Sequence, residues 1–157
     1  MKATSVLELA RQRGVMIATA ESCTGGLIAA ALTEVAGSSD AFDRGFVTYS
    51  NEAKMEMLGV KAQTLADFGA VSDQTAREMA AGALAHSRAG IAVSVTGIAG
   101  PGGGSVDKPV GRVCFGIATS RHLHAETRDF GDLGRAGVRA ATVDHALDLI
   151  ALALSQD

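Results

Sequence analysis

The sequence feature that most constrains the fold is a corner between a strand-like and a helix-like segment. Val15 to Thr19 is short, apolar and partly β-branched, whereas Leu27 to Val35 carries apolar residues at helical spacing. Between them lies Ala20-Glu21-Ser22-Cys23-Thr24-Gly25-Gly26, in which a small hydroxyl precedes two glycines. This arrangement predicts a β–corner–α unit of an α/β fold, with Ser22 beside the free N–H groups of a helix start.

Helix-like and strand-like segments alternate through the first two thirds of the chain, and a hairpin and a helix follow. Ser5 and Glu8 have the spacing of a capping box and predict a first helix that Gly14 can end, and Gly37 is a natural stop for the helix after the corner. Further helices are predicted over residues 51–58, 62–68, 73–87 and 135–154, and further strands over residues 42–49, 91–96, 110–119 and 122–130. This order predicts a mixed five-stranded sheet covered by helices on both faces.

Length and charge limit the class of protein. The 157 residues fit one domain, residues 1–157, and 47% of them are apolar, which suffices for a core. The formal net charge is −3 and aromatic residues make up only 4%, so neither nucleic acid nor an anionic membrane is an expected partner. The N-terminus lacks the apolar stretch of a secretory signal, and no segment approaches the roughly 20 apolar residues that span a bilayer. We therefore expect a soluble cytoplasmic protein.

The two cysteines do not have the spacing of a zinc or redox site. Cys114 is expected to be a small buried hydrophobic residue. The same is expected of Cys23, although it adjoins the corner and is also a candidate reactive thiol. No metal site is predicted.

Ser22 needs a base to act as a nucleophile, and Lys54 is a better candidate than a histidine. The four histidines are each expected on the surface or on a helix face: His86, His122, His124 and His145. Lys54 begins the helix just after the second strand and can point back toward the corner, which gives a Ser–Lys arrangement. As a base it requires a pKa lowered from about 10.4 toward roughly 7–8, through burial or a nearby positive potential. The alternative is a solvated lysine paired with Glu52 or Glu56.

Two further groups could assist Ser22. Tyr49 is the only tyrosine and is expected at a strand end, where it could relay a proton, hold Ser22 or merely cap the core edge. The N–H groups of Thr24, Gly25 and Gly26 could form an oxyanion hole at the start of the helix. An ordinary Thr-Gly-Gly turn is the alternative for these three residues.

A glycine-rich loop, residues 97–105, follows the predicted central strand. Its glycines, Gly97 and Gly100 among them, can bring bare backbone close to a ligand. In a sheet of this kind ligands bind beyond the carboxyl ends of the parallel strands. The loop is expected at that edge together with Ser22 and Tyr49.

Arg139 lies near the start of the final helix, on the inward line of its apolar stripe. A cation at that place opposes the helix dipole unless an anion joins it. A phosphate bound between Arg139, the helix N-terminus and the glycine-rich loop would remove the conflict. The alternative is an arginine that turns to solvent or pairs with Asp132.

Four motifs, in the same order along the chain, carry a family resemblance. They are Ala20-Glu21-Ser22-Cys23-Thr24-Gly25-Gly26, Gly45-Phe46-Val47-Thr48-Tyr49-Ser50-Asn51-Glu52-Ala53-Lys54, Gly69-Ala70-Val71-Ser72, and Thr96-Gly97-Ile98-Ala99-Gly100-Pro101 with Lys108-Pro109-Val110-Gly111. Together they resemble the CinA C-terminal domain family, the nicotinamide-nucleotide amidase (NMN deamidase) group, over essentially the whole chain. The resemblance implies a three-layer α/β/α sandwich with a mixed, mostly parallel five-stranded sheet. It also implies hydrolysis of the carboxamide of nicotinamide mononucleotide (NMN) to nicotinate mononucleotide and ammonia.

The resemblance further implies roles for residues that match the family motifs. Ser22 would be the nucleophile, Lys54 the general base and Tyr49 an assisting hydroxyl. The residues implied to hold the substrate, chiefly its phosphate, are Thr96, Gly97, Gly100 and Arg139. A small-molecule substrate, no cofactor, no metal and a homo-oligomer are also implied.

Two other functions stay open on the sequence alone. One is a non-catalytic nucleotide- or phosphate-binding module with a regulatory role, which would use the glycine-rich loop and Arg139. The other is an enzyme of the same chemistry that acts on a different small amide or ester.

Overall fold

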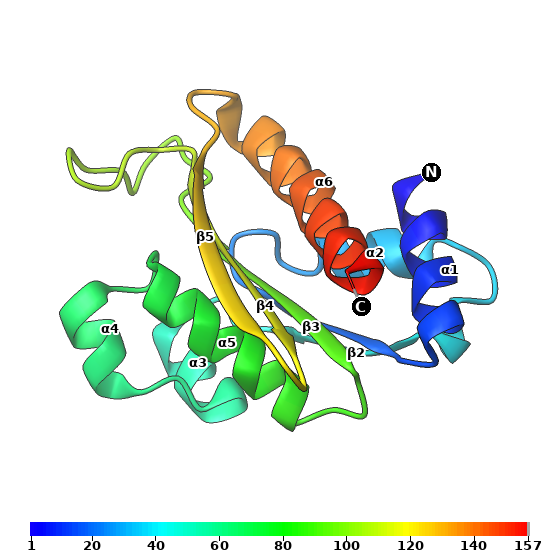
Figure 1. Ribbon diagram of the computed structural model, residues 1–157. Coiled ribbons are helices and arrows are strands. Elements are labelled where there is room, and N and C mark those ends of the chain that lie inside the picture. Colours follow the sequence, from blue (N-terminus) through cyan, green and yellow to red (C-terminus); the bar gives the residue numbers. More distant parts are fainter. Residues whose placement is uncertain (157) are drawn as a thin grey trace.

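A five-stranded sheet lies between two layers of helices in the computed structural model, which describes residues 1–156 (Figure 1). The helices are α1 (Lys2–Arg13), α2 (Leu27–Thr33), α3 (Asn51–Leu58), α4 (Ala62–Phe68), α5 (Asp73–Ala85) and α6 (Gly134–Ser155), with a 3₁₀ turn, η1, at Ser38–Asp40. The strands are β1 (Ile17–Glu21), β2 (Phe42–Val47), β3 (Ile91–Gly97), β4 (Arg112–Thr119) and β5 (Leu123–Asp129). Every predicted helix and strand is present, in the predicted order.

The strands are arranged in the order β2-β1-β3-β4-β5. β1 pairs in parallel with β2 and β3, whereas the β3–β4 and β4–β5 pairs are antiparallel. All strands except β4 therefore run in one direction, which confirms the mixed, mostly parallel sheet. Because β1, β2 and β3 share a direction, the segments that follow Glu21, Val47 and Gly97 leave the sheet at the same edge.

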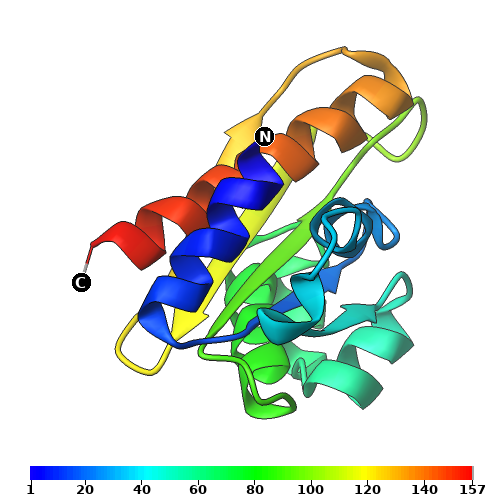
Figure 2. The same ribbon diagram turned by 90° about the vertical axis from the view of Figure 1, so that its right-hand side faces the viewer.

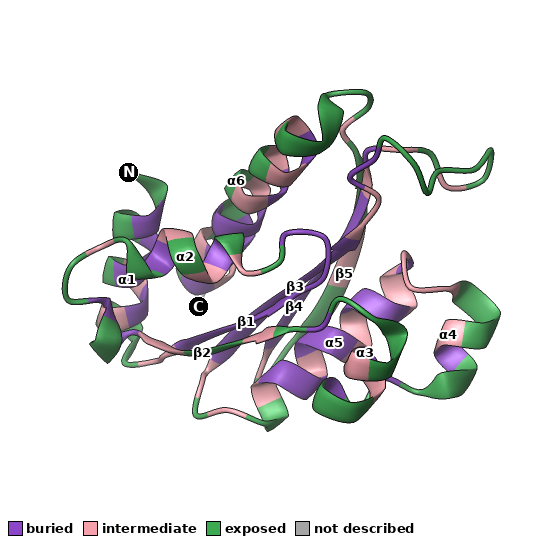
Figure 3. Cartoon of the chain, turned by 180° about the vertical axis from the view of Figure 1, so that it is seen from behind, coloured by how far each residue is buried: buried purple, intermediate pink, exposed green. Residues whose placement is uncertain are grey.

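Helices α1, α2 and α6 cover one face of the sheet, and α3, α4 and α5 cover the other (Figure 1 and Figure 2). On the first face, Leu147 and Ile150 of α6 share a hydrophobic cluster with Phe115 of β4. On the second face, Met79 of α5 shares a cluster with Ala92 of β3. The central strands β1 and β3 are buried along almost their whole length (Figure 3). This arrangement is the predicted three-layer α/β/α sandwich.

Small residues allow α5 to approach both the sheet and α3 closely. A Cβ at Gly116 of β4 would overlap the carbonyl oxygen of Ala76 in α5, and a Cβ at Gly82 of α5 would overlap the carbonyl oxygen of Leu58 in α3. The Ser94 hydroxyl of β3 also donates a hydrogen bond of 2.5 Å to the Ala76 carbonyl. These contacts fix α3 against α5 and α5 against the sheet, so they set the position of α3 relative to the end of β1.

The start of the first helix differs from the sequence prediction. The helix begins at Lys2, so Ser5 lies inside it and not at its N-cap, and the Ser5 hydroxyl donates to the Met1 carbonyl. The predicted capping box of Ser5 and Glu8 is therefore wrong. Gly14 ends the helix as predicted, in the left-handed conformation with φ 66°.

Two boundaries near the corner also differ. α2 ends at Thr33, and Gly37 precedes the 3₁₀ turn instead of ending the helix. β2 ends at Val47, which pairs with Glu21, the last residue of β1. Tyr49 therefore lies two residues beyond the strand, in the connection to α3.

Candidate active site

The corner after β1 is held by a buried carboxylate. Glu21 is 1% exposed and accepts hydrogen bonds from the Thr24 hydroxyl (2.5 Å) and from the N–H groups of Ile28 (2.8 Å) and Ala29 (3.0 Å). Its negative charge offsets the positive end of the α2 dipole. The carboxylate therefore ties the turn that carries Ser22 to the first turn of α2.

Lys54 reaches Ser22 from the first turn of α3. Its Nζ lies 3.0 Å from Ser22 Oγ and also donates to the carbonyl oxygens of Thr48 (2.9 Å) and Tyr49 (3.4 Å) after β2. Lys54 is 1% exposed. The alternative of a solvated lysine paired with a neighbouring glutamate is therefore wrong, and Ser22 has a potential base within hydrogen-bonding distance.

Burial favours the neutral form of this lysine. It lowers the pKa of Lys54 below the ordinary value of 10.5, because the ammonium loses its hydration; the nearby Cys23 thiol acts weakly in the opposite direction. The start of α3, which carries the positive end of the helix dipole, also disfavours a cation there. A lowered pKa increases the fraction of Lys54 that can accept a proton from Ser22 near neutral pH.

A pocket of about 260 Å³ opens beside Ser22 and Lys54, at the edge where the three parallel strands end. Six predicted site residues line it: Ser22, Tyr49, Lys54, Thr96, Gly97 and Gly100. Apolar wall residues include Val71 and Ile98. The Thr96 hydroxyl is buried and donates to the Ala70 carbonyl (2.8 Å), so it fixes one wall of the pocket. The structure thus brings the three predicted segments together around one cavity.

Arg135 is a pocket residue that sequence reasoning missed. It lies on the first turn of α6 and lines the pocket, and its guanidinium donates to the Gly100 carbonyl (2.9 Å) and to the Tyr49 hydroxyl (3.1 Å). The Tyr49 side chain is 63% exposed, and its hydroxyl contacts Arg135 and not Ser22. Arg135 lies four residues, about one helical turn, before Arg139. Extending the predicted inward line of the final helix by one more turn would therefore have identified Arg135 from the sequence.

Arg139 itself does not line this pocket; its Nε donates to the Cys23 carbonyl (3.1 Å) and its Nη2 to the Thr24 carbonyl (3.2 Å). The expected phosphate ligand is thus engaged with the backbone of the corner. Both alternatives, a solvated side chain and a pair with Asp132, also differ from this arrangement. Arg139 was predicted on the inward line of the final helix, and Arg135 lies one turn earlier on that line, but which of the two faces the pocket depends on the tilt of α6.

The predicted oxyanion residues lie outside the pocket lining, and their role stays a prediction. Thr24, Gly25 and Gly26 do not line the pocket, and the Gly25 N–H already donates to the Ser22 carbonyl (3.1 Å). Cys23 lines the pocket instead, and within residues 1–156 no other residue accepts a hydrogen bond from its N–H. The backbone N–H that follows the nucleophile is the usual oxyanion donor at such corners. Gly25 and Gly26 serve the turn through their positive φ angles of 59° and 112°.

The thiol of Cys23 is expected to be inert. It is 6% exposed, and burial raises its pKa to about 11, so almost none of it is thiolate at neutral pH. Iodoacetamide at pH 7 should therefore label Cys23 in the folded protein far more slowly than in the protein unfolded in urea, as peptide mass spectrometry would measure. Equally rapid labelling of folded and unfolded protein would contradict this expectation.

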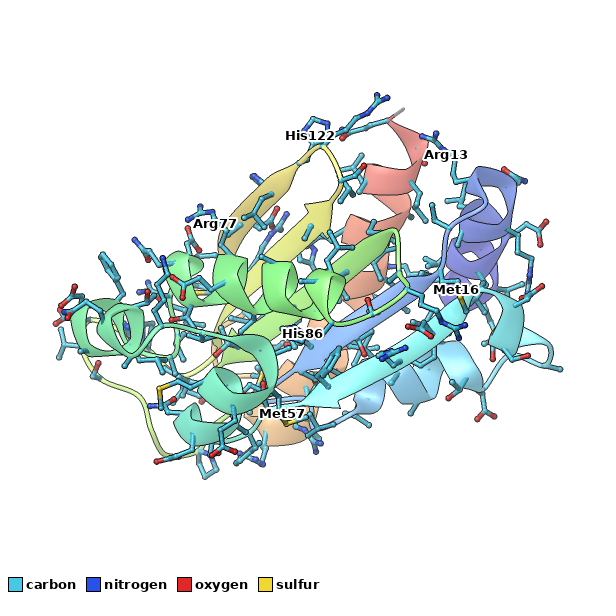
Figure 4. All side chains as sticks on the ribbon, turned by 90° about the horizontal axis from the view of Figure 1, so that it is seen from below. Arg13, Met16, Met57, Arg77, His86 and His122 are labelled. Atoms are coloured by element: carbon cyan, nitrogen blue, oxygen red, sulfur yellow. The ribbon has the colours of Figure 1, made fainter. Side chains whose placement is uncertain are left out.

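The histidines lie away from the pocket lining, as predicted. His122 lies at the turn between β4 and β5 and His86 at the end of α5 (Figure 4). His145 of α6 is half-buried, with Nε2 2.9 Å from a carboxylate oxygen of Glu126, and its ring packs edge-on against Phe115. None of the histidines in the described chain is therefore in place to act as a base for Ser22.

Among residues 1–156, no helix is both long and apolar enough to cross a membrane. Over the same residues, no group of three or more histidine, cysteine, aspartate or glutamate side chains is arranged to hold a metal ion.

Comparisons with known proteins agree on one family. A family model described as the CinA C-terminal domain matches residues 1–154. The chain is 64% identical over 116 residues to a "CinA-like protein" of Chloroherpeton thalassium, a match that covers 74% of this chain and 28% of that protein. It is 51% identical over 140 residues to "Nicotinamide-nucleotide amidohydrolase PncC" of Escherichia coli, with 89% of this chain and 85% of that protein covered.

A solved structure gives the same result. The competence/damage inducible protein CihA from Agrobacterium tumefaciens is 55% identical, with a TM-score of 0.89 and coverage of 97% of this chain and 96% of that chain. The chain therefore spans less than a third of the Chloroherpeton protein and most of the other two proteins.

Proposed function

This chain belongs to the CinA C-terminal domain family, and on that premise we propose that it hydrolyses the carboxamide of NMN to nicotinate mononucleotide and ammonia. A relative that it covers over most of its length is named for amide hydrolysis of a nicotinamide nucleotide. The observation that carries the proposal is the 3.0 Å contact between Lys54 Nζ and Ser22 Oγ beside the pocket.

In the proposed reaction the neutral Lys54 amine takes the proton of Ser22, and Ser22 Oγ attacks the carboxamide carbon. The carbonyl oxygen becomes an oxyanion, for which the Cys23 N–H is the candidate donor. The Lys54 ammonium then returns the proton to the leaving nitrogen, so ammonia departs and an ester with Ser22 is left. Lys54 takes a proton from water as it attacks this ester, and then returns that proton to Ser22 Oγ as nicotinate mononucleotide leaves, which regenerates free Ser22 and neutral Lys54.

The rest of the pocket suits a nucleotide substrate. The apolar residues Val71 and Ile98 offer contacts for a pyridine ring, and backbone of the glycine-rich loop offers N–H and carbonyl groups. Arg135 presents a guanidinium at the same pocket, and guanidinium groups bind phosphate through paired hydrogen bonds. We therefore assign the phosphate contact to Arg135 and not to Arg139.

An ammonia-release assay with NMN, nicotinamide riboside and nicotinamide tests the proposal. The protein should release ammonia and nicotinate mononucleotide in equal amounts from NMN, and much less from the two compounds without phosphate. Saturable binding of NMN in calorimetry without ammonia release over hours would instead indicate the non-catalytic binding module. Rapid hydrolysis of another small amide or ester, but not of NMN, would contradict NMN as the substrate and would still agree with hydrolysis by Ser22 and Lys54.

A further inference from the structure

Arg139 places a positive charge on the backbone of the corner, although the proposed chemistry does not use it. The guanidinium is half-buried and donates to two consecutive carbonyls, those of Cys23 and Thr24. Hydrogen bonds from a charged donor are stronger than those between neutral groups. This side chain therefore both fixes and polarises the turn that follows Ser22.

Two peptide units connect Arg139 to the pocket. The Thr24 carbonyl accepts from Arg139 Nη2, and the same peptide unit contains the Gly25 N–H. That N–H donates to the Ser22 carbonyl at 3.1 Å, and the peptide unit of this carbonyl contains the Cys23 N–H. The series of hydrogen bonds thus ends at the N–H that follows the nucleophile, on a residue that lines the pocket.

Hydrogen bonds in series strengthen one another. A donor that polarises a carbonyl makes the N–H of the same peptide unit a better donor, by about 10–30% per bond. We propose that Arg139 is a positioning residue that strengthens the Cys23 N–H as oxyanion donor through the Thr24–Gly25 and Ser22–Cys23 peptide units. This inference rests on the amide hydrolysis proposed above.

Because of Glu21, stabilisation of an anion beside this corner depends on a positive charge other than the start of α2. Its carboxylate occupies the N–H groups of Ile28 and Ala29, so the start of α2 is neutralised and contributes little to an anion in the pocket. Arg139 lies on the carbonyls of the same turn and supplies the opposite charge. The turn is therefore held between a carboxylate and a guanidinium, and its oxyanion donor is polarised from the Arg139 side.

Substitution of Arg139 tests this role. R139M should lower kcat for NMN by about two- to eightfold with KM unchanged, since the donor is weakened by about 10–30% and not removed; loss of a whole oxyanion donor costs about 100- to 1,000-fold. R139K should lie between the wild type and R139M, because one ammonium cannot reproduce the fork of a guanidinium. R11M is the matched control: Arg11 also donates to a backbone carbonyl, that of Gly37 at 3.0 Å, but this carbonyl lies outside the turn that follows Ser22, and kcat should not change.

A second measurement separates this role from a structural one and from the proposed function. The rate at which p-nitrophenyl acetate acylates Ser22, followed by mass spectrometry, needs no NMN and should also fall about two- to eightfold in R139M. The acidic limb of the pH profile of acylation should keep its midpoint, because the Ser22–Lys54 contact is retained. If p-nitrophenyl acetate acylates the wild type but the wild type does not hydrolyse NMN, NMN is not the substrate. The acylation rates of wild type and R139M then still test the role of Arg139.

Three results would overturn the inference: equal acylation rates in R139M and wild type, a raised KM for NMN with unchanged kcat, or a shifted acidic limb. The second would make Arg139 a substrate contact, and the third would mean that it only keeps the dyad in place. The melting temperature shows whether R139M is folded. If it is not, the comparison of R139K with the wild type decides by the same three criteria.

Discussion

Replacing Lys54 with methionine is expected to lower kcat for NMN by about 100- to 10,000-fold, the contribution typical of a positioned general base. Lys54 Nζ is the amine 3.0 Å from Ser22 Oγ, and methionine fills a similar volume without accepting a proton. Ser22→Ala removes the nucleophile and should cost about 10,000-fold or more. Because the two groups act as a unit, the double variant should be little slower than Ser22→Ala alone. Ammonia release from NMN measures all three.

Lys61→Met is the matched control for the lysine substitution. Lys61 is an exposed residue at the start of α4, so its loss should leave kcat unchanged. The melting temperature of each variant shows that a loss of activity is not a loss of fold. Wild-type activity in folded Lys54→Met would contradict the Ser–Lys mechanism.

The pH profile gives an independent check of the same lysine. Lys54 acts as a base only when neutral, so kcat/KM should rise with pH while Lys54 loses its proton and level off above its pKa. Burial lowers this pKa, so the midpoint of the rise should lie below pH 10.5. The Lys54→Met variant should lose this rise, whereas a wild-type profile that falls over the same range would contradict the assignment.

The fold could be predicted from the sequence because local signals agree with one another. α3 and α4 lie over the predicted residues 51–58 and 62–68, since each is ended by a glycine, Gly59 or Gly69, with a positive φ. The first helix start was wrong because capping-box spacing also occurs inside helices, and Ser5 there donates to the carbonyl one turn before it.

The contact between Ser22 and Lys54 could be predicted for a topological reason, whereas the positions of Arg135 and Cys23 in the pocket lining could not. Parallel strands end at one edge, so Ser22 after β1 and Lys54 after β2 are brought together by the chain order alone. Which arginine of α6 faces the pocket depends on how the helix is tilted over the sheet. Which N–H of the corner is free depends on the β-turn hydrogen bond from the Gly25 N–H to the Ser22 carbonyl, which the prediction for these residues did not include.

Replacing Arg135 with methionine is expected to raise KM for NMN by about 10- to 150-fold while kcat changes little. Hydrogen bonds to charged groups contribute about 1.5–3 kcal/mol, and tenfold in affinity corresponds to about 1.4 kcal/mol. Arg135 lines the pocket, and the Gly100 carbonyl and Tyr49 hydroxyl hold its guanidinium in place. Steady-state kinetics of ammonia release from NMN give both constants.

The phosphate assignment is separated from a general effect on the pocket by comparing substrates. Nicotinamide riboside has no phosphate, so kcat/KM for it should be nearly the same in Arg135→Met and wild type. The control Arg128→Met removes an exposed arginine of β5 that pairs with Glu126 and does not line the pocket, so KM for NMN should not change. An equal loss for both substrates in Arg135→Met would mean that Arg135 supports the loop at Gly100 and does not bind phosphate. In that case the preference for a phosphorylated substrate would have to come from other donors at the same pocket, such as the backbone N–H groups of the glycine-rich loop or the side-chain amide of Asn51.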